Sequence, residues 1–81
     1  MDSNNIQRAK NVLATLFDIS PDEINETSSP DTLPAWDSLG HMHLVVGLEE
    51  EFGIQLSVEQ TLNMMNFELV CSTVQEAIDA K

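Results

Sequence analysis

The two ends of one central segment constrain the fold of this chain most. Asp37 is a residue type that caps helix starts, and Gly53 stands where a helix commonly ends. Between them, at about 100° per residue, four apolar side chains fall on one side of a helix. They are Leu44, Val45, Leu48 and Phe52. We therefore predict a helix from Ser38 to about Phe52 with that side against a core.

A first helix is predicted near the N-terminus, because apolar residues recur there at intervals of three and four. They are Ile6, Ala9, Leu13, Leu16 and Phe17. Asn4 or Ser3 can cap the start of this helix, which should end between Phe17 and Ile19.

Three serines precede a glutamate or glutamine by three residues, which is capping-box spacing, in which two side chains bond reciprocally to the backbone at a helix start. They are Ser20 with Glu23, Ser57 with Gln60, and Ser72 with Gln75. The first pair predicts one short turn around Ile24. The second predicts a shorter helix through Leu62 to about Met65. The third predicts that a last helix opens at this point, with Val74, Ala77 and Ile78 facing inward.

A long loop separates the first two principal helices. Residues 25–37 contain two prolines and several small polar residues. Side chains usually tie so long a loop to the core, and Ile24, Leu33 and Trp36 are the candidates. No segment sustains strand alternation. We predict one all-α domain over residues 1–81: a small bundle of three principal helices plus one short helix.

The charge of the chain indicates which classes of macromolecule it can bind. The formal net charge is -11, and the only lysine and arginine residues are Arg8, Lys10 and Lys81. Because phosphate binding needs cations, we expect nucleic acid and anionic membranes to be poor partners. Proteins with basic surfaces are favoured instead, since opposite charge speeds encounter.

The single cysteine, Cys71, cannot form an intramolecular disulfide. We therefore expect a reducing, cytoplasmic location, and we see neither a signal peptide nor an apolar run long enough to span a membrane. We expect a monomer. No basic neighbour would lower the pKa of Cys71, so we expect a small buried side chain rather than a reactive thiol.

The helix from Ser38 carries a second apolar stripe made of Leu39, Met42 and Val46. One stripe suffices to bury a helix of this length. Either the helix is buried nearly all round, or the second stripe is exposed. We favour an exposed docking surface, with Met42 and Val46 as the apolar grip and Glu49 and Glu50 as its charged rim.

Ser38 stands at the predicted start of this helix, where backbone N–H groups lack helical partners. A phosphate attached there would be stabilised by those groups and by the helix dipole. The alternative is that Ser38 only helps Asp37 to cap the helix.

The run "DSLGHMHLVVGLEEEFGI" resembles the carrier-protein family, the acyl and peptidyl carriers of fatty-acid, polyketide and peptide synthesis. In that family Asp-Ser-Leu opens the second helix, and apolar residues and an acidic stretch then lead to Phe-Gly-Ile. Here Asp37, Ser38 and Leu39 match the opening, and the run from Leu44 to Ile54 matches the rest.

The resemblance implies that Ser38 carries 4′-phosphopantetheine, moved from coenzyme A by a phosphopantetheinyl transferase, with Asp37 and Leu39 completing the attachment motif. The thiol of that arm would hold acyl or aminoacyl groups as thioesters. The protein would present them to acyl-loading and acyl-processing enzymes with basic docking surfaces, and would not itself be an enzyme.

Gly40 and His43 depart from fatty-acid carriers, which often have acidic residues at these positions. The sequence looks more like stand-alone carriers of polyketide, aminoacyl or surface-polysaccharide pathways, with fatty-acid synthesis as the other pathway left open. Fatty-acid enzymes should then accept it poorly, and Gly40→Asp with His43→Glu should improve it by restoring the acidic rim.

Two other kinds of site are considered and set aside. His41 and His43 point roughly 200° apart on a helix, so they cannot share a metal ion. Ser38 and His41 lie one turn apart, but an orienting acid and an oxyanion hole are not evident. We expect His41 at the edge of the core and His43 exposed. The remaining alternative to a carrier is an acidic helical adaptor without a prosthetic group that binds a basic protein.

Overall fold

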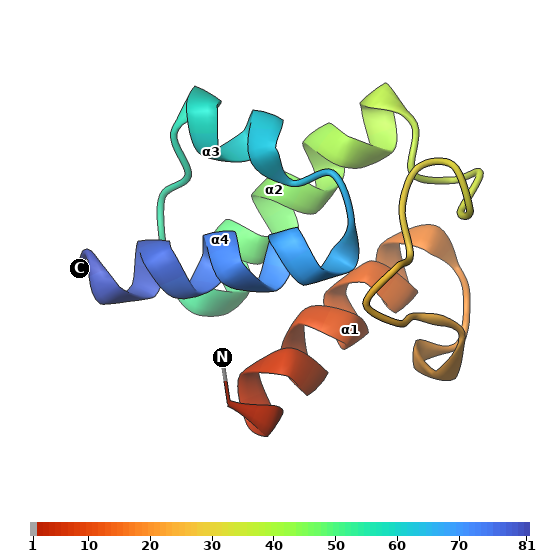
Figure 1. The fold of residues 1–81 in the computed structure, drawn as a ribbon, viewed down its shortest axis with the longest axis horizontal. Coiled ribbons are helices and arrows are strands. Elements are labelled where there is room, and N and C mark those ends of the chain that lie inside the picture. Colours follow the sequence, from red (N-terminus) through yellow and green to blue (C-terminus); the bar gives the residue numbers. More distant parts are fainter. Residues whose placement is uncertain (1) are drawn as a thin grey trace.

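The computed structural model describes residues 2–81, which form a small bundle of helices without strands (Figure 1). Its elements are α1 (Ser3–Phe17), the 3₁₀ turn η1 (Pro21–Glu23), α2 (Ser38–Phe52), α3 (Val58–Asn63) and α4 (Phe67–Asp79). The prediction of three principal helices plus one short helix is confirmed. The long loop occupies the predicted place between η1 and α2.

The core lies where α1, α2 and α4 meet. Six side chains have no exposed surface: Ala9, Leu13, Leu44, Leu48, Val70 and Val74. Each of these three helices contributes two of them, so the apolar stripe of each principal helix faces one shared core. Burying one such leucine or valine stabilises the fold by about 1.5–3 kcal/mol relative to exposure.

Arg8 joins α1 to the end of α2. Its Nε lies 2.8 Å from Glu51 Oε2, and a terminal nitrogen donates to the Glu51 carbonyl oxygen at 2.6 Å. Its guanidinium carbon lies 4.5 Å from the centre of the Phe52 ring. A cation at a helix C-terminus also interacts favourably with the dipole. Because both charged side chains are more than a third exposed, the ion pair itself adds at most about 1 kcal/mol.

The predicted start of α1 is wrong by one or two residues. Its cap is Asp2, whose side chain accepts a hydrogen bond from the Asn5 N–H at 2.8 Å. Asp37 and Gly53 take the predicted places at the two ends of α2, with Gly53 left-handed at φ 62°. The capping boxes of Ser20 and Ser57 are also confirmed.

The predicted start of the last helix is also wrong. α4 begins at Phe67, and its cap is Asn66, which accepts from the Leu69 N–H at 2.8 Å. Ser72 lies inside the helix, where its hydroxyl donates to the Leu69 carbonyl at 3.2 Å. Phe67 and Val70 are buried, so the apolar face of the helix extends well before Ser72. Capping-box spacing also occurs within helices, and here the apolar face decides the start.

The long loop is fastened to the core and to α4. Ile24 and Trp36 are buried, and Leu33 is half-buried, which confirms the predicted ties. In addition, the backbone N–H groups of Phe67 and Glu68 donate to loop carbonyls, at 2.8 Å and 3.2 Å respectively. The loop therefore satisfies donors at the start of α4 that no helical carbonyl can reach.

Candidate functional site

Ser38 is the first residue of α2 and is exposed. Asp37 precedes it and accepts a hydrogen bond from the Gly40 N–H at 2.8 Å. The N–H groups of Ser38 and Leu39 lie in the first turn, where no helical carbonyl can pair with them. The serine hydroxyl is therefore presented to solvent at the positive end of a four-turn helix.

Three neighbouring aromatic rings support the segment before Ser38. The Trp36 side chain is only 1% exposed and packs near Phe17 and His41. Its ring centre is 6.0 Å from that of Phe17 and 6.2 Å from that of His41. These separations lie within the range of favourable aromatic contacts. Trp36 thus fixes the chain two residues before the serine against α1 and α2.

His41 also bonds through both ring nitrogens. Its Nδ1 accepts from the Trp36 indole N–H at 2.9 Å, and its Nε2 lies 2.8 Å from the Thr61 carbonyl oxygen. The ring is half-buried, whereas His43 is exposed, as the sequence predicts. Because both nitrogens have other partners, the ring has no nitrogen free to act as a base for Ser38.

Gly40 allows the loop to approach α2 closely. A Cβ at this position would collide with the Ala35 carbonyl oxygen and would lie 3.2 Å from a Phe17 ring carbon. The sequence-based interpretation of Gly40 is a gap in an acidic rim, which Gly40→Asp should fill. The structure shows that this interpretation is wrong, because any side chain at this position must displace the loop that leads to Ser38.

A groove of about 780 Å³ lies beside Ser38, and we call it the serine groove. The loop, the start of α2 and the α3 region form its walls. Its lining includes Ser38, Trp36, Met42, Leu62, Met64 and Met65. The apolar lining suits a flexible, partly apolar group attached at Ser38.

The second stripe of α2 is exposed, as predicted. Leu39, Met42 and Val46 are each more than half exposed. The two rim carboxylates differ: Glu50 is exposed, but Glu49 is half-buried and accepts from the Leu56 N–H at 2.9 Å. Glu49 therefore also holds the link between α2 and α3.

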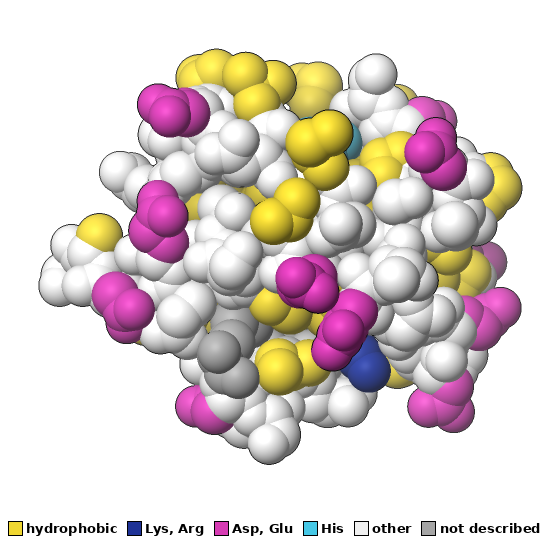
Figure 2. All heavy atoms as spheres, in the orientation of Figure 1, with side chains coloured by type: hydrophobic (Ala, Val, Ile, Leu, Met, Phe, Trp, Pro, Cys, Tyr) yellow, Lys and Arg dark blue, Asp and Glu magenta, His cyan; other side chains and the backbone are white. Residues whose placement is uncertain are grey.

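A further apolar strip lies on α3 and the segment that follows it, and the sequence reasoning missed it. Val58, Leu62 and Met65 are 77%, 72% and 66% exposed. Figure 2 shows apolar side chains gathered along the edge where α3 lies in Figure 1. Met42 of α2 and Leu62 of α3 line the same groove. This strip could have been predicted from the sequence, because Val58, Leu62 and Met65 recur at intervals of four and three residues, as apolar residues on one helix face do.

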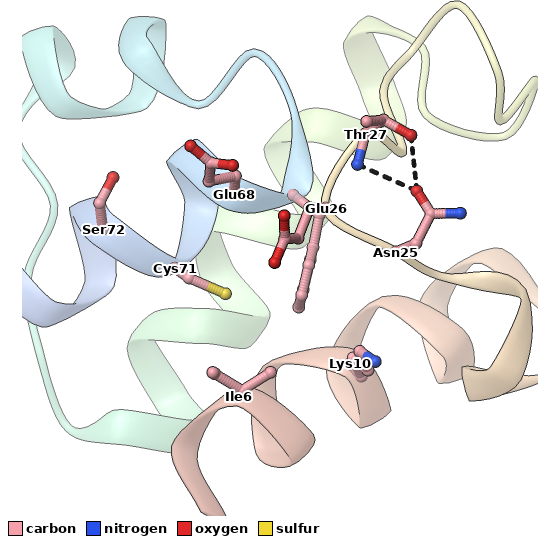
Figure 3. A pocket seen from close by; sticks show the side chains of 9 residues that line it. Ile6, Lys10, Asn25, Glu26, Thr27, Glu68, Cys71 and Ser72 are labelled. Carbon is pink, nitrogen blue, oxygen red and sulfur yellow. Dashed lines mark hydrogen bonds between the residues drawn. The ribbon is translucent and has the colours of Figure 1, made fainter. Parts of the chain in front are cut away.

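A second groove, of about 750 Å³, lies between α1, the loop and α4 (Figure 3). Ile6, Lys10 and Cys71 line it, and no residue lines both grooves. Cys71 is half-buried, and burial raises the pKa of its thiol to about 11. This direction agrees with the predicted unreactive thiol. The prediction that no basic residue neighbours Cys71 is wrong, because Lys10 lines the same groove and its charge lowers the pKa, by less than burial raises it.

Two further features of residues 2–81 bear on the kind of site. They contain no group of three or more histidine, cysteine or acidic side chains placed to hold a metal ion. None of their helices has the length and apolar character needed to cross a membrane.

Comparison with known proteins gives a partial match to an acyl carrier protein. No protein-family profile matches the chain. Over 45 residues it is 40% identical to the chloroplastic acyl carrier protein of Brassica napus. The match covers 56% of this chain and 34% of that protein, so the similarity spans about a third of the relative's length. This similarity supports a relationship to acyl carrier proteins and, in general terms, a carrier role.

Proposed function

We propose that this chain is a carrier protein that bears 4′-phosphopantetheine on Ser38 and presents acyl or aminoacyl groups to partner enzymes. The exposed hydroxyl of Ser38 at the start of α2, next to the serine groove, carries this proposal. The acyl-carrier relative and the Asp37-Ser38-Leu39 motif support it.

The residues around Ser38 fit the prosthetic group. Asp37 caps α2 by accepting from the Gly40 N–H. The N–H groups of the first two helical residues therefore remain able to donate hydrogen bonds to a phosphodiester on Ser38. The apolar wall of the serine groove could shelter the arm or a short acyl chain. When attached, the group supplies a terminal thiol that forms thioesters.

The chain itself would hold the acyl or aminoacyl group covalently and would catalyse no reaction. The Ser38 oxygen is the nucleophile in a reaction catalysed by a separate phosphopantetheinyl transferase. Tethering then raises the effective concentration of the bound group at each partner enzyme. We propose Met42 and Val46 as the apolar grip for these partners, with Glu50 and, in part, Glu49 as the charged rim.

We extend the proposed docking surface to α3 and the segment that follows it, because Leu62 and Met65 are exposed and line the serine groove together with Met42. Partners would combine an apolar contact with flanking basic residues, as the net charge of -11 favours. A specialised polyketide, aminoacyl or surface-polysaccharide pathway, a monomeric state and a cytoplasmic location complete the proposal.

The test is the mass of the protein after incubation with coenzyme A and a transferase of broad specificity. The wild type should gain one phosphopantetheine group, and Ser38→Ala should gain none. Ser72→Ala is the matched control, because Ser72 is an exposed serine inside a helix. A wild type that gains nothing, or a Ser38→Ala protein that still gains mass, would favour the adaptor without a prosthetic group.

A further inference from the structure

The His41 ring connects three segments that surround Ser38. It belongs to α2, it bonds to Trp36 in the loop, and it bonds to Thr61 in α3. Trp36, His41 and Thr61 all line the serine groove. A single side chain therefore joins both walls of the groove to the helix that begins at Ser38.

The partners of the ring determine its protonation state. An indole N–H can only donate, so Nδ1 of His41 must accept and carries no proton. A carbonyl oxygen can only accept, so Nε2 must carry the proton and donate to Thr61. Both bonds form together only in the neutral ring with the proton on Nε2. A charged ring would direct one N–H against another, and the Trp36 bond would be lost.

We propose that His41 is a positioning residue for Ser38: its neutral ring holds the loop and α3 in place around the serine, and protonation releases the loop. Trp36 stands two residues before Ser38 and is nearly fully buried, so freeing its indole loosens the segment that presents the serine. The link to modification of Ser38 rests on the proposed function.

Few charged groups face the ring. From the loop, Asp31 and Asp37 line the same groove. The α3 region contributes only uncharged lining residues to it. On α2 itself, His43 is exposed and points away, roughly 200° around the helix. Because His43 is the other histidine of the chain, His43→Gln is a matched control for every effect of pH.

The first experiment follows the indole proton of Trp36, the chain's single tryptophan, by NMR hydrogen exchange, and follows the nitrogen shifts of His41. At about pH 8, Nδ1 should carry no proton. As the pH is lowered from about 8 to about 5, protection of the wild-type indole should fall, because a doubly protonated ring cannot accept from the indole N–H. A fall of about tenfold corresponds to loss of one buried hydrogen bond, after correction for free-indole exchange.

Three variants sharpen this comparison. His41→Phe keeps a ring without nitrogens, and its indole should exchange fast at both pH values. His41→Gln offers an acceptor and a donor whose protonation does not change over this pH range. The protection of the Trp36 indole in this variant should therefore not depend on pH. His43→Gln should behave as the wild type. A protonated Nδ1 at about pH 8, or wild-type protection that does not change with pH, would overturn the proposal.

The second experiment measures how fast the transferase modifies Ser38, as the ratio of wild type to His41→Gln at each pH, so that the enzyme's own pH dependence cancels. This ratio should fall about tenfold on acidification, in step with the indole. A constant ratio would overturn the positioning role. If no protein gains mass at any pH, the proposed function has failed, and the exchange data alone decide whether His41 holds the loop.

Discussion

Gly40 packs against the carbonyl oxygen of Ala35, with no room for a Cβ between them. By helix propensity alone, Gly40→Ala should stabilise α2 by about 1 kcal/mol. We predict the opposite sign, a loss of about 1–3 kcal/mol, because the added methyl group must displace the loop backbone. Urea unfolding measures this difference.

Gly47 provides the control for this substitution. A Cβ there would lie 3.1 Å from a Val12 methyl and 3.3 Å from a Leu16 methyl, which are ends of side chains rather than backbone. Gly47→Ala should therefore cost less than Gly40→Ala. A Gly40→Ala protein that is more stable than the wild type would show that the loop yields easily.

Substitution of Glu49 and of Glu50 should have different effects, the first on the stability of the fold and the second on the binding of a partner. Glu49→Ala removes the acceptor of the Leu56 N–H and should cost about 1 kcal/mol of unfolding free energy. Glu50→Ala should leave stability unchanged, since Glu50 is exposed. The salt dependence of association with a basic partner should weaken for Glu50→Ala. Equal thermal stability of the two variants would contradict this assignment.

Cys71 should resist alkylation in the folded protein. Burial raises the pKa of its thiol from about 9 to about 11, so the thiol stays protonated at neutral and mildly alkaline pH. At about pH 8, the thiolate fraction should be about a hundredfold lower than in the protein unfolded in urea. Timed reaction with iodoacetamide measures this ratio. Equal rates in the two states would show a freely reactive thiol.

The same shift predicts how stability depends on pH. Because the folded state holds the thiol proton more tightly, the contribution of Cys71 is fully present below about pH 9 and falls as the pH rises towards about 11. Cys71→Ala should remove this dependence, which urea unfolding at several pH values detects.

His43 offers a place to restore acidic charge without disturbing the fold. His43→Glu should leave stability unchanged, because the side chain is exposed. It should speed loading by a malonyl-transferring enzyme of fatty-acid synthesis at low salt, with little gain at high salt. Each new surface ion pair is worth only about 0–1 kcal/mol. A wild type that already loads as fast as a fatty-acid carrier would argue against a specialised pathway.

Local signals made much of this fold predictable. Asp37, Gly53 and the Ser57–Gln60 pair act on backbone groups within a few residues, so their spacing suffices to place helix ends. The same rule placed the start of the last helix wrongly at Ser72, because the true cap, Asn66, lies before a buried Phe67. Local spacing does not reveal which apolar residue meets the core.

The candidate site was predictable only in part. The exposed serine and the second stripe of α2 follow from helical periodicity. The bond between His41 and Thr61 joins residues twenty positions apart, and the space at Gly40 depends on a folded loop. Such contacts between distant segments have no local pattern. Only the three-dimensional arrangement reveals that the residues around Ser38 hold one another in place.

The most direct test of the central claim is the intact mass of this protein purified from cells that contain a phosphopantetheinyl transferase. We predict a population heavier by one phosphopantetheine group, with the added mass on the peptide that contains Ser38. Ser38→Ala, made in the same cells, should have only the mass of its polypeptide. A wild type that stays unmodified in such cells, and also after incubation with coenzyme A and purified transferase, would contradict the carrier role.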